Sequence, residues 1–292
     1  MITIITDSAA DIPKEEAEKY GIRVLAIPLS VDGASYLEGE DVTTREFYRL
    51  LVGARELPTT AQVTPFRYRE AFEEAAARPD CTGIVCITIN AQGSGMYQGA
   101  LMAREDLLED RPQLSDKGFT IDVVDSGSYT YVYGHAVVDA ARAASQGKDR
   151  EEILQIFARR NQSHQVFFGL TNLEYAKRSG RITAAAAFAG EVLGFRPIMT
   201  IREGRIDTIA KVRGDKKLVD TMLELYKERR SGDGRGFYIV YADNKAMGQQ
   251  LRRTIEKETK DKCLGEYDIG ASVTINAGPT VFGVIVPVDG IR

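Results

Sequence analysis

The chain has 292 residues, of which 27% are charged, and its formal net charge is −4. That balance and the lack of a basic arm argue against nucleic-acid binding, and no apolar stretch reaches the roughly 18 residues that a membrane-spanning helix needs. Three cysteines without a CxxC motif, after an N-terminus without a signal-peptide pattern, indicate a reducing compartment, so we expect a cytoplasmic protein.

Strands and helices alternate through the first half of the chain. Apolar, β-branched runs predict strands at residues 2–6, 24–29, 84–89 and 120–124. Helix-start signals and apolar spacing predict a helix that begins at Pro13, and further helices at residues 45–51, 65–77, 96–108 and 133–144. This alternation predicts a parallel sheet with helices on both faces, a three-layer α/β/α domain.

The pattern changes after one more helix, which ends near residue 161. We predict strands at residues 165–170, 197–201, 206–212, 236–241, 272–275 and 281–286, with a tight turn at Gly204. We predict helices at residues 172–178, 184–193, 216–229 and 244–260. We therefore assign residues 1–160 to an N-terminal α/β domain and residues 161–292 to a C-terminal α+β domain with a mixed sheet.

Polar loops follow several of the predicted strands. Hydroxyl, carboxylate and glycine residues gather at residues 7–8, 59–64, 90–96 and 125–128. In parallel sheets, ligands bind outside the carboxyl ends of the strands. Ser94 and Gly95 stand directly before the predicted helix 96–108, where unpaired N–H groups and the helix dipole favour an anion. The loop predicts either a site for a carboxylate or phosphate, or a serine that only caps the helix.

Ten short motifs along the chain carry a resemblance to a known family. In chain order they are Thr6-Asp7-Ser8-Ala9-Ala10-Asp11-Ile12-Pro13, Ile27-Pro28-Leu29, Thr60-Ala61-Gln62, Ser94-Gly95-Met96-Tyr97-Gln98, Val124-Asp125-Ser126, Asn172-Leu173-Glu174-Tyr175, Ser179-Gly180-Arg181-Ile182, Arg196-Pro197-Ile198, Lys211-Val212-Arg213-Gly214 and Ala277-Gly278-Pro279. Each motif is weak alone, but the set spans nearly the whole chain in the right order. On these residues the chain resembles the DegV family, the bacterial fatty-acid-binding proteins.

The resemblance implies two different α/β domains that hold a long-chain fatty acid in an apolar tunnel. It also implies a non-enzymatic carrier, which presents the acyl carboxylate to a separate ATP-dependent fatty acid kinase for acyl-phosphate formation. Neither a metal nor a cofactor is implied, only the bound fatty acid. By position, Thr60 and Ser94 contact the carboxylate. The implied ligand-binding residues are Thr60, Ala61, Ser94, Gly95, Met96, Asn276 and Ala277.

Three positions depart from the family pattern. The family's Thr-Ser-Gln has Ala61 at its centre here, its Ser-Gly-Thr ends in Met96, and Asn276 stands where the family often has a histidine. A buried carboxylate needs hydrogen-bond partners. We therefore expect Thr60, Ser94, the loop N–H groups and the Asn276 amide to supply them, or this member to prefer another head group.

Two further groups of residues are candidates for contact with the tail or with the partner. The alanine-rich run at residues 183–189 either leaves room for an acyl tail or packs as an ordinary helix face. Arg181, Arg202 and Arg205 form either a docking patch for the kinase or a solvated basic surface.

Two other classes of function stay open. The polar loops also suit a stand-alone phosphotransferase or hydrolase that acts on a small polar substrate. His135 and His164 are far apart in sequence and the loops offer no usual general base, which counts against that class. Asp7 and Asp125 fit caps of the turns that follow their strands. The remaining alternative is a regulatory protein with a structural lipid.

Overall fold

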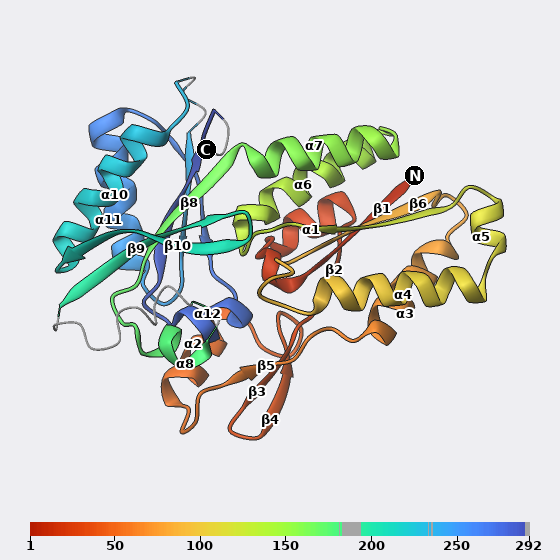
Figure 1. The fold of residues 1–292 in the computed structure, drawn as a ribbon, viewed down its shortest axis with the longest axis horizontal. Helices are drawn as coiled ribbons and strands as arrows, with labels where there is room; N and C mark the ends of the chain where they lie inside the picture. Colours follow the sequence, from red (N-terminus) through yellow and green to blue (C-terminus); the bar gives the residue numbers. More distant parts are fainter. Residues whose placement is uncertain (181, 183–193, 233, 235, 290–292) are drawn as a thin grey trace. The chain divides into compact units, whose positions relative to one another are not determined.

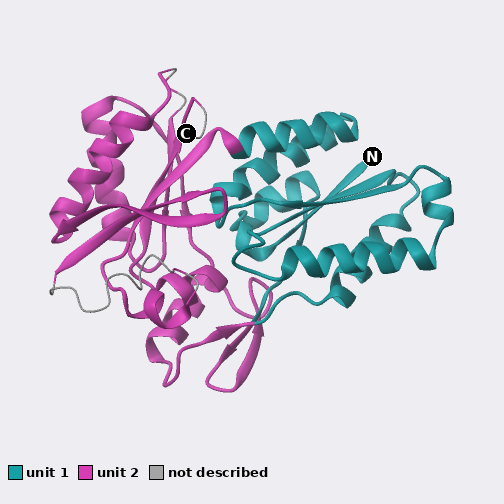
Figure 2. Ribbon diagram, viewed as in Figure 1, with its two compact units in different colours: residues 1–28, 61–161 teal, residues 29–60, 162–292 magenta. Residues whose placement is uncertain are grey.

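The chain forms two compact units (Figures 1 and 2). The computed structural model describes residues 1–180, 182, 194–232, 234 and 236–289. Unit 1 comprises Met1–Pro28 and Ala61–Asn161, and unit 2 comprises Leu29–Thr60 and Gln162–Arg292. Residues 29–60 thus belong with the C-terminal part of the chain. The division into an N-terminal domain of residues 1–160 and a C-terminal domain of residues 161–292 stays a prediction.

Unit 1 is built on a parallel sheet with the strand order β2-β1-β6-β7. Its strands are β1 (Ile2–Asp7), β2 (Arg23–Leu25), β6 (Gly83–Thr88) and β7 (Thr120–Asp125). The two central strands, β1 and β6, are buried along their whole length, as expected of a sheet that is covered on both faces. The prediction of a parallel α/β sheet is confirmed.

Helices cover both faces of this sheet. They are η1 (Ser8–Ala10), α1 (Lys14–Tyr20), α3 (Pro65–Ala76), α4 (Met96–Asp110), α5 (Gln113–Asp116), α6 (Tyr131–Ser145) and α7 (Arg150–Gln162). Helices α3 and α4 pack on each other and on β6, and α6 packs on β1 and α1. Figure 1 shows α3 and α4 along one side of the sheet and α6 along the other.

The predicted strand at residues 24–29 is wrong, because the chain breaks there into two strands of different sheets. The backbone N–H of Ile27 donates to the Ser8 hydroxyl over 3.0 Å, which removes it from the ladder that ends at Leu25. The next strand, β3 (Pro28–Val31), belongs to a three-stranded sheet with the order β4-β3-β5. Its partners are β4 (Ala34–Leu37) and β5 (Thr59–Thr60).

Unit 2 carries a mixed sheet with the strand order β10-β9-β8-β13-β11-β12. Its strands are β8 (His164–Gly169), β9 (Phe195–Arg202), β10 (Arg205–Arg213), β11 (Phe237–Tyr241), β12 (Cys263–Asp268) and β13 (Phe282–Pro287). All described pairings are antiparallel except that of β11 with β12. The predicted mixed sheet is confirmed, although the sequence pattern did not predict β12.

The helices of unit 2 divide between the mixed sheet and the smaller sheet. The described ones are α2 (Thr44–Gly53), α8 (Glu174–Ser179), α10 (Asp215–Arg229), α11 (Lys245–Thr259) and α12 (Ala271–Ala277). Helices α10 and α11 pack on each other and on the mixed sheet, where Phe167, Phe237 and Phe282 lie in the core. Helix α12 instead packs against α2, α8 and β5.

Residues 272–275 are helical, so the strand predicted there is wrong. The Glu38 carboxylate, itself buried, accepts the backbone N–H of Ser272 over 2.8 Å at the start of α12. The Thr274 hydroxyl donates to the carbonyl of Ile269 over 3.1 Å. These tertiary and local bonds outweigh the strand preference of the β-branched residues. The predicted alanine-rich helix at residues 184–193 lies outside the described residues.

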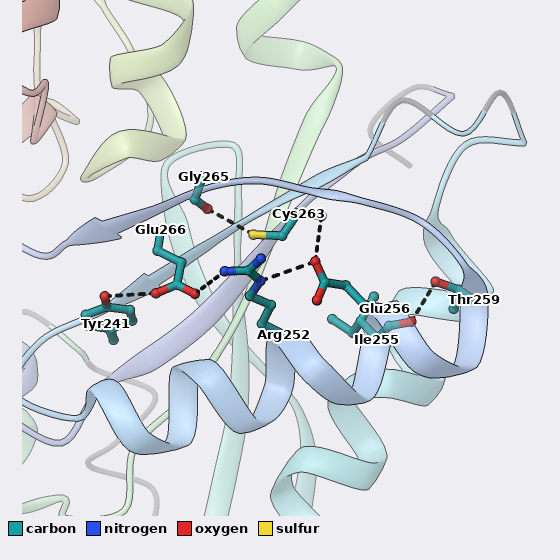
Figure 3. Close-up of polar contacts among 8 residues, drawn as sticks. All are labelled: Tyr241, Arg252, Ile255, Glu256, Thr259, Cys263, Gly265 and Glu266. Carbon is teal, nitrogen blue, oxygen red and sulfur yellow. Dashed lines mark hydrogen bonds and ion pairs between the residues drawn. The ribbon is translucent and has the colours of Figure 1, made fainter.

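An ion-pair network ties α11 to the edge strand β12 (Figure 3). Arg252 on α11 donates to Glu266 of β12 over 2.9 Å and to Glu256 over 3.2 Å. The Tyr241 hydroxyl donates to the other oxygen of Glu266 over 3.2 Å. Burial and next the Glu266 charge raise the pKa of Tyr241 to about 12, so the phenol stays a donor. The network thus joins the edge strand of the mixed sheet to α11 and to β11.

Candidate functional site

The loop between β6 and α4 is held by hydrogen bonds from its own unit. The backbone N–H of Asn90 donates to the carbonyl of Ser128 over 3.0 Å, and the Asn90 amide donates to the Tyr129 hydroxyl over 2.7 Å. The Asp125 carboxylate accepts the N–H groups of Ala91 at 3.0 Å and of Gly127 at 2.9 Å. The bond to Gly127 forms the turn predicted for Asp125. The loops after β6 and β7 therefore form one braced polar rim.

Ser94 lies on this rim with its hydroxyl uncommitted. Its oxygen accepts only a long contact of 3.4 Å from the N–H of Met96, and Gly95 takes the N-cap position of α4. Among the described residues, the half-buried Ser94 hydroxyl donates no hydrogen bond. Ser94 is thus a weak cap with a free donor, beside the start of a 15-residue helix.

The residues that follow Ser94 serve close packing. A Cβ on Gly95 would stand 2.1 Å from the Gln62 amide oxygen, so glycine is needed for the approach of that side chain. The Met96 side chain is buried, with 2% of its surface exposed, and contributes to the core. Of the three implied residues, the structure leaves Ser94 free to bind, Gly95 as a spacer and Met96 as packing.

Thr60 and Asn276 both belong to unit 2. Thr60 pairs with Leu29 in the β3–β5 ladder, and β5 packs against α12, the helix that carries Asn276. The half-buried Thr60 side chain makes no hydrogen bond among the described residues. The Asn276 amide donates to the carbonyl of Ser272, one helical turn earlier, over 2.8 Å. One donor of the expected Asn276 contact is therefore already engaged within its own helix.

The other implied site residues have mixed surroundings. Ala61 is exposed, and its N–H donates to the carbonyl of Pro28 over 2.9 Å. Ala277 is buried in α12. Arg205 is exposed and faces Glu203 at 3.7 Å, whereas the Arg202 side chain is half-buried and its Nε has no partner among the described residues. Arg181 lies outside the described residues.

The chemistry that the described residues can supply is hydrogen bonding rather than metal binding. No group of three or more histidine, cysteine, aspartate or glutamate side chains is placed to hold a metal ion in the part of the chain that the structure describes. Over the same residues, no helix is long and apolar enough to cross a bilayer.

Sequence reasoning missed two features of the rim. Asp7 was expected to cap the following turn, and that prediction is wrong: its side chain makes no cap bond and is fully buried, bonded to Ile89 and Tyr133. Gln62 was part of a motif but had no assigned contact. The available signal for Asp7 was its place at the end of a β-branched run of isoleucine and threonine that predicts a buried strand, where a carboxylate must find buried donors.

Comparison with known proteins agrees with this fold. The model of the DegV family of uncharacterised proteins matches residues 1–288. A DegV domain-containing protein of Caldanaerobacter subterraneus is 30% identical over 290 residues, covering 97% of each chain. A DegV domain-containing protein of Clostridium perfringens is 31% identical over 286 residues, again covering 97% of each.

Two solved structures resemble the chain along nearly its whole length. A fatty-acid-binding DegV family protein from Thermus thermophilus superimposes with a TM-score of 0.84 at 25% identity, covering 98% of this chain and 99% of the other. A stearic acid-binding protein from Eubacterium ventriosum superimposes with a TM-score of 0.86 at 26% identity, covering 99% and 98%. The family match, the curated relatives and the shared fold agree: the chain belongs to the DegV family.

Proposed function

We propose that this protein binds a long-chain fatty acid and presents its carboxylate to an ATP-dependent fatty acid kinase, without itself being an enzyme. The observation that carries the proposal is the likeness of nearly the whole chain to two solved proteins, one described as fatty-acid-binding and the other as stearic acid-binding. We infer further that the protein acts in the cytoplasm and takes no cofactor beyond its lipid.

The head group is assigned to donors that the fold leaves uncommitted. Ser94 and Thr60 each carry a half-buried hydroxyl that donates no hydrogen bond among the described residues. A hydrogen bond to a charged group contributes about 1.5–3 kcal/mol. Asn276 contributes less than the family's histidine would, because part of its amide is bound to Ser272.

The tail needs an apolar surface, and the mixed sheet of unit 2 offers one. Strand alternation puts Phe167 and Phe282 in the core shared with α10 and α11. It puts Phe168 and Ile285 on the opposite face, and both are buried. We propose that the acyl chain runs along this second face. About fourteen methylenes at roughly 0.8 kcal/mol each supply on the order of 11 kcal/mol before ordering costs.

Lipid binding is tested by native mass spectrometry of protein purified without detergent, with the released lipid identified after denaturation. The expected result is one fatty acid per chain. Ser94→Ala and Thr60→Ala should each weaken palmitate binding about tenfold and leave hexadecanol binding unchanged. Matched controls are Thr59→Ala, the exposed neighbour on β5, and Ser115→Ala, an exposed serine on α5. An empty protein that takes up no added fatty acid refutes the proposal.

The carrier role is tested by mixing the palmitate-loaded protein with a bacterial fatty acid kinase and ATP. Acyl-phosphate should form only when both proteins are present. Arg205→Glu should slow its formation and leave lipid affinity unchanged, because Arg205 is exposed and outside the head-group residues. Bound lipid without acyl-phosphate would favour a structural lipid. Turnover of a small phosphorylated substrate by this protein alone would favour the enzyme.

A further inference from the structure

We propose that Asp7 is the positioning residue of the carboxylate site: its buried side chain fixes the loop that presents Ser94. The inference rests on the proposed function and deepens it, since it names what makes the site selective for a carboxylate head group. Asp7 does not touch the ligand in this proposal. It acts through the backbone of the loop.

Asp7 joins three elements of unit 1. It is the last residue of β1 and is fully buried. One carboxylate oxygen accepts the N–H of Ile89, the residue that directly follows β6, over 2.8 Å. The other accepts the hydroxyl of Tyr133 on α6 over 2.7 Å. The start of the Ser94 loop is therefore bound to both the neighbouring strand and a helix.

The Tyr133 hydroxyl is a dependable donor. Burial and next the Asp7 charge hold the pKa of Tyr133 well above its usual range, so the phenol stays protonated. Burial and next the Asp7 charge also raise the pKa of Tyr68, which is fully buried as well. The buried Asp7 carboxylate is held in one orientation, because the Tyr133 hydroxyl and the Ile89 N–H replace hydrogen bonds that it would otherwise make with water.

The loop that Asp7 anchors is short and held at further points. Only Asn90 to Gly93 separate Ile89 from Ser94, and Asn90 is itself fully buried and bonded to the loop after β7. Because the bonds of Asn90 and Ala91 join this segment to the loop after β7, a displacement of Ile89 would shift the braced loops together and carry Ser94 with them. Hydrogen bonds weaken steeply when distance or angle departs from the best geometry. Loss of the Asp7 anchor should for that reason reduce head-group selectivity more than tail binding.

The experiment compares affinity for palmitate with affinity for hexadecanol, which has the same tail but no carboxylate. Asp7→Ala should lower the ratio of the two affinities about tenfold, while hexadecanol affinity stays within about threefold. Asp7→Asn should restore the ratio, because the amide oxygen can accept from Ile89 and its NH₂ can donate to the Tyr133 hydroxyl. Tyr133→Phe removes the bond from the phenol and keeps the bond from Ile89, so it should give an intermediate ratio, and it serves if Asp7→Ala fails to fold.

The matched control is Thr6→Val. Thr6 is the preceding residue of β1, is fully buried, and donates to the carbonyl of Ile87 within β6 over 2.8 Å. It should lower stability without changing the affinity ratio. If Thr6→Val and Asp7→Ala lower the ratio equally, or if neither Asp7→Ala nor Tyr133→Phe changes it, Asp7 has no positioning role. If wild-type protein binds neither compound, the proposed function fails instead.

Discussion

One buried polar pair in each sheet shows how the place of such a pair decides its role. In the parallel sheet of unit 1, Asp7 and Asn90 are buried where strands end and loops begin. In the mixed sheet of unit 2, Gln165 and Thr200 are buried within neighbouring strands and bond each other over 3.1 Å. Polar groups at strand ends orient loops, whereas those within strands stabilise only the sheet. Substitution of Asp7 should therefore change ligand selectivity, and substitution of Thr200 should change stability alone.

The largest losses of stability are expected from substitutions at two glycines, one in each unit. A Cβ at Gly134 would stand 2.0 Å from the carbonyl oxygen of Ala10, and one at Gly283 would stand 2.6 Å from that of Phe167. A backbone carbonyl can be displaced only with a shift of its strand or helix. Gly134→Ala and Gly283→Ala should therefore each lower the free energy of unfolding by roughly 2–4 kcal/mol. Urea denaturation measures both. Gly53→Ala, with no atom within 4 Å, is the control and should be neutral or stabilising.

A smaller effect should come from the buried pair of the mixed sheet. Thr200→Val leaves the Gln165 amide without its partner and should cost about 1–3 kcal/mol. Thr208→Val on the neighbouring strand is the matched control, since the Thr208 hydroxyl is buried without a partner among the described residues. Denaturation midpoints should separate the two variants. If Thr200→Val changed the ratio of palmitate affinity to hexadecanol affinity, polar groups within the mixed sheet would also affect ligand selectivity.

The smallest effect is expected at the sheet edge. Arg252→Met should cost at most about 1 kcal/mol, because 41% of the Arg252 side chain is exposed.

The ion pair of Arg252 and Glu266 should also make the stability of the fold depend on pH. Burial acts to raise the pKa of Glu266, but the hydrogen bonds from Arg252 and Tyr241 outweigh it, so the folded pKa lies below the ordinary 4.5. The pair's contribution is thus present above pH 4.5 and is lost as the pH falls through the lowered value. Stability measured at neutral pH and below pH 4.5 should differ less in Arg252→Met than in the wild type. An equal loss in both proteins would show that other carboxylates dominate.

Local sequence signals predicted an element correctly where residues close in sequence decide its structure. The helix predicted at residues 45–51 begins with a capping box: the Glu46 N–H donates to the Thr43 hydroxyl over 3.3 Å, and the Thr43 N–H donates to the Glu46 carboxylate over 2.9 Å. The predicted turn at Gly204 is confirmed by positive φ angles at Glu203 and Gly204. Strands β1, β6 and β13 were predictable because wholly buried strands are continuous apolar runs.

Distant partners explain what the sequence pattern could not predict. Residues 272–275 look like a strand until Glu38, far away in sequence, binds the N–H of Ser272. The single predicted strand at 24–29 breaks because Ser8 binds Ile27. The predicted place of Ser94 just before a helix is confirmed, since α4 begins at Met96, whereas its contact with a ligand stays a prediction. The engagement of Asn276 within α12 and the burial of Met96 depend on packing that no motif records.

The early segment 29–60 also has a consequence for synthesis. Its Tyr48 hydroxyl bonds the carbonyl of Ile269 over 2.6 Å, and its Glu38 bonds Ser272, partners that are 221 and 234 residues away. A ribosome completes the residues of unit 1 before it has made either partner. During that interval the segment has no place to bury Phe47, Tyr48 and Leu51, which are all buried in the folded chain. The nascent protein therefore carries these apolar side chains exposed through most of its translation, and this is where we expect a chaperone to bind it.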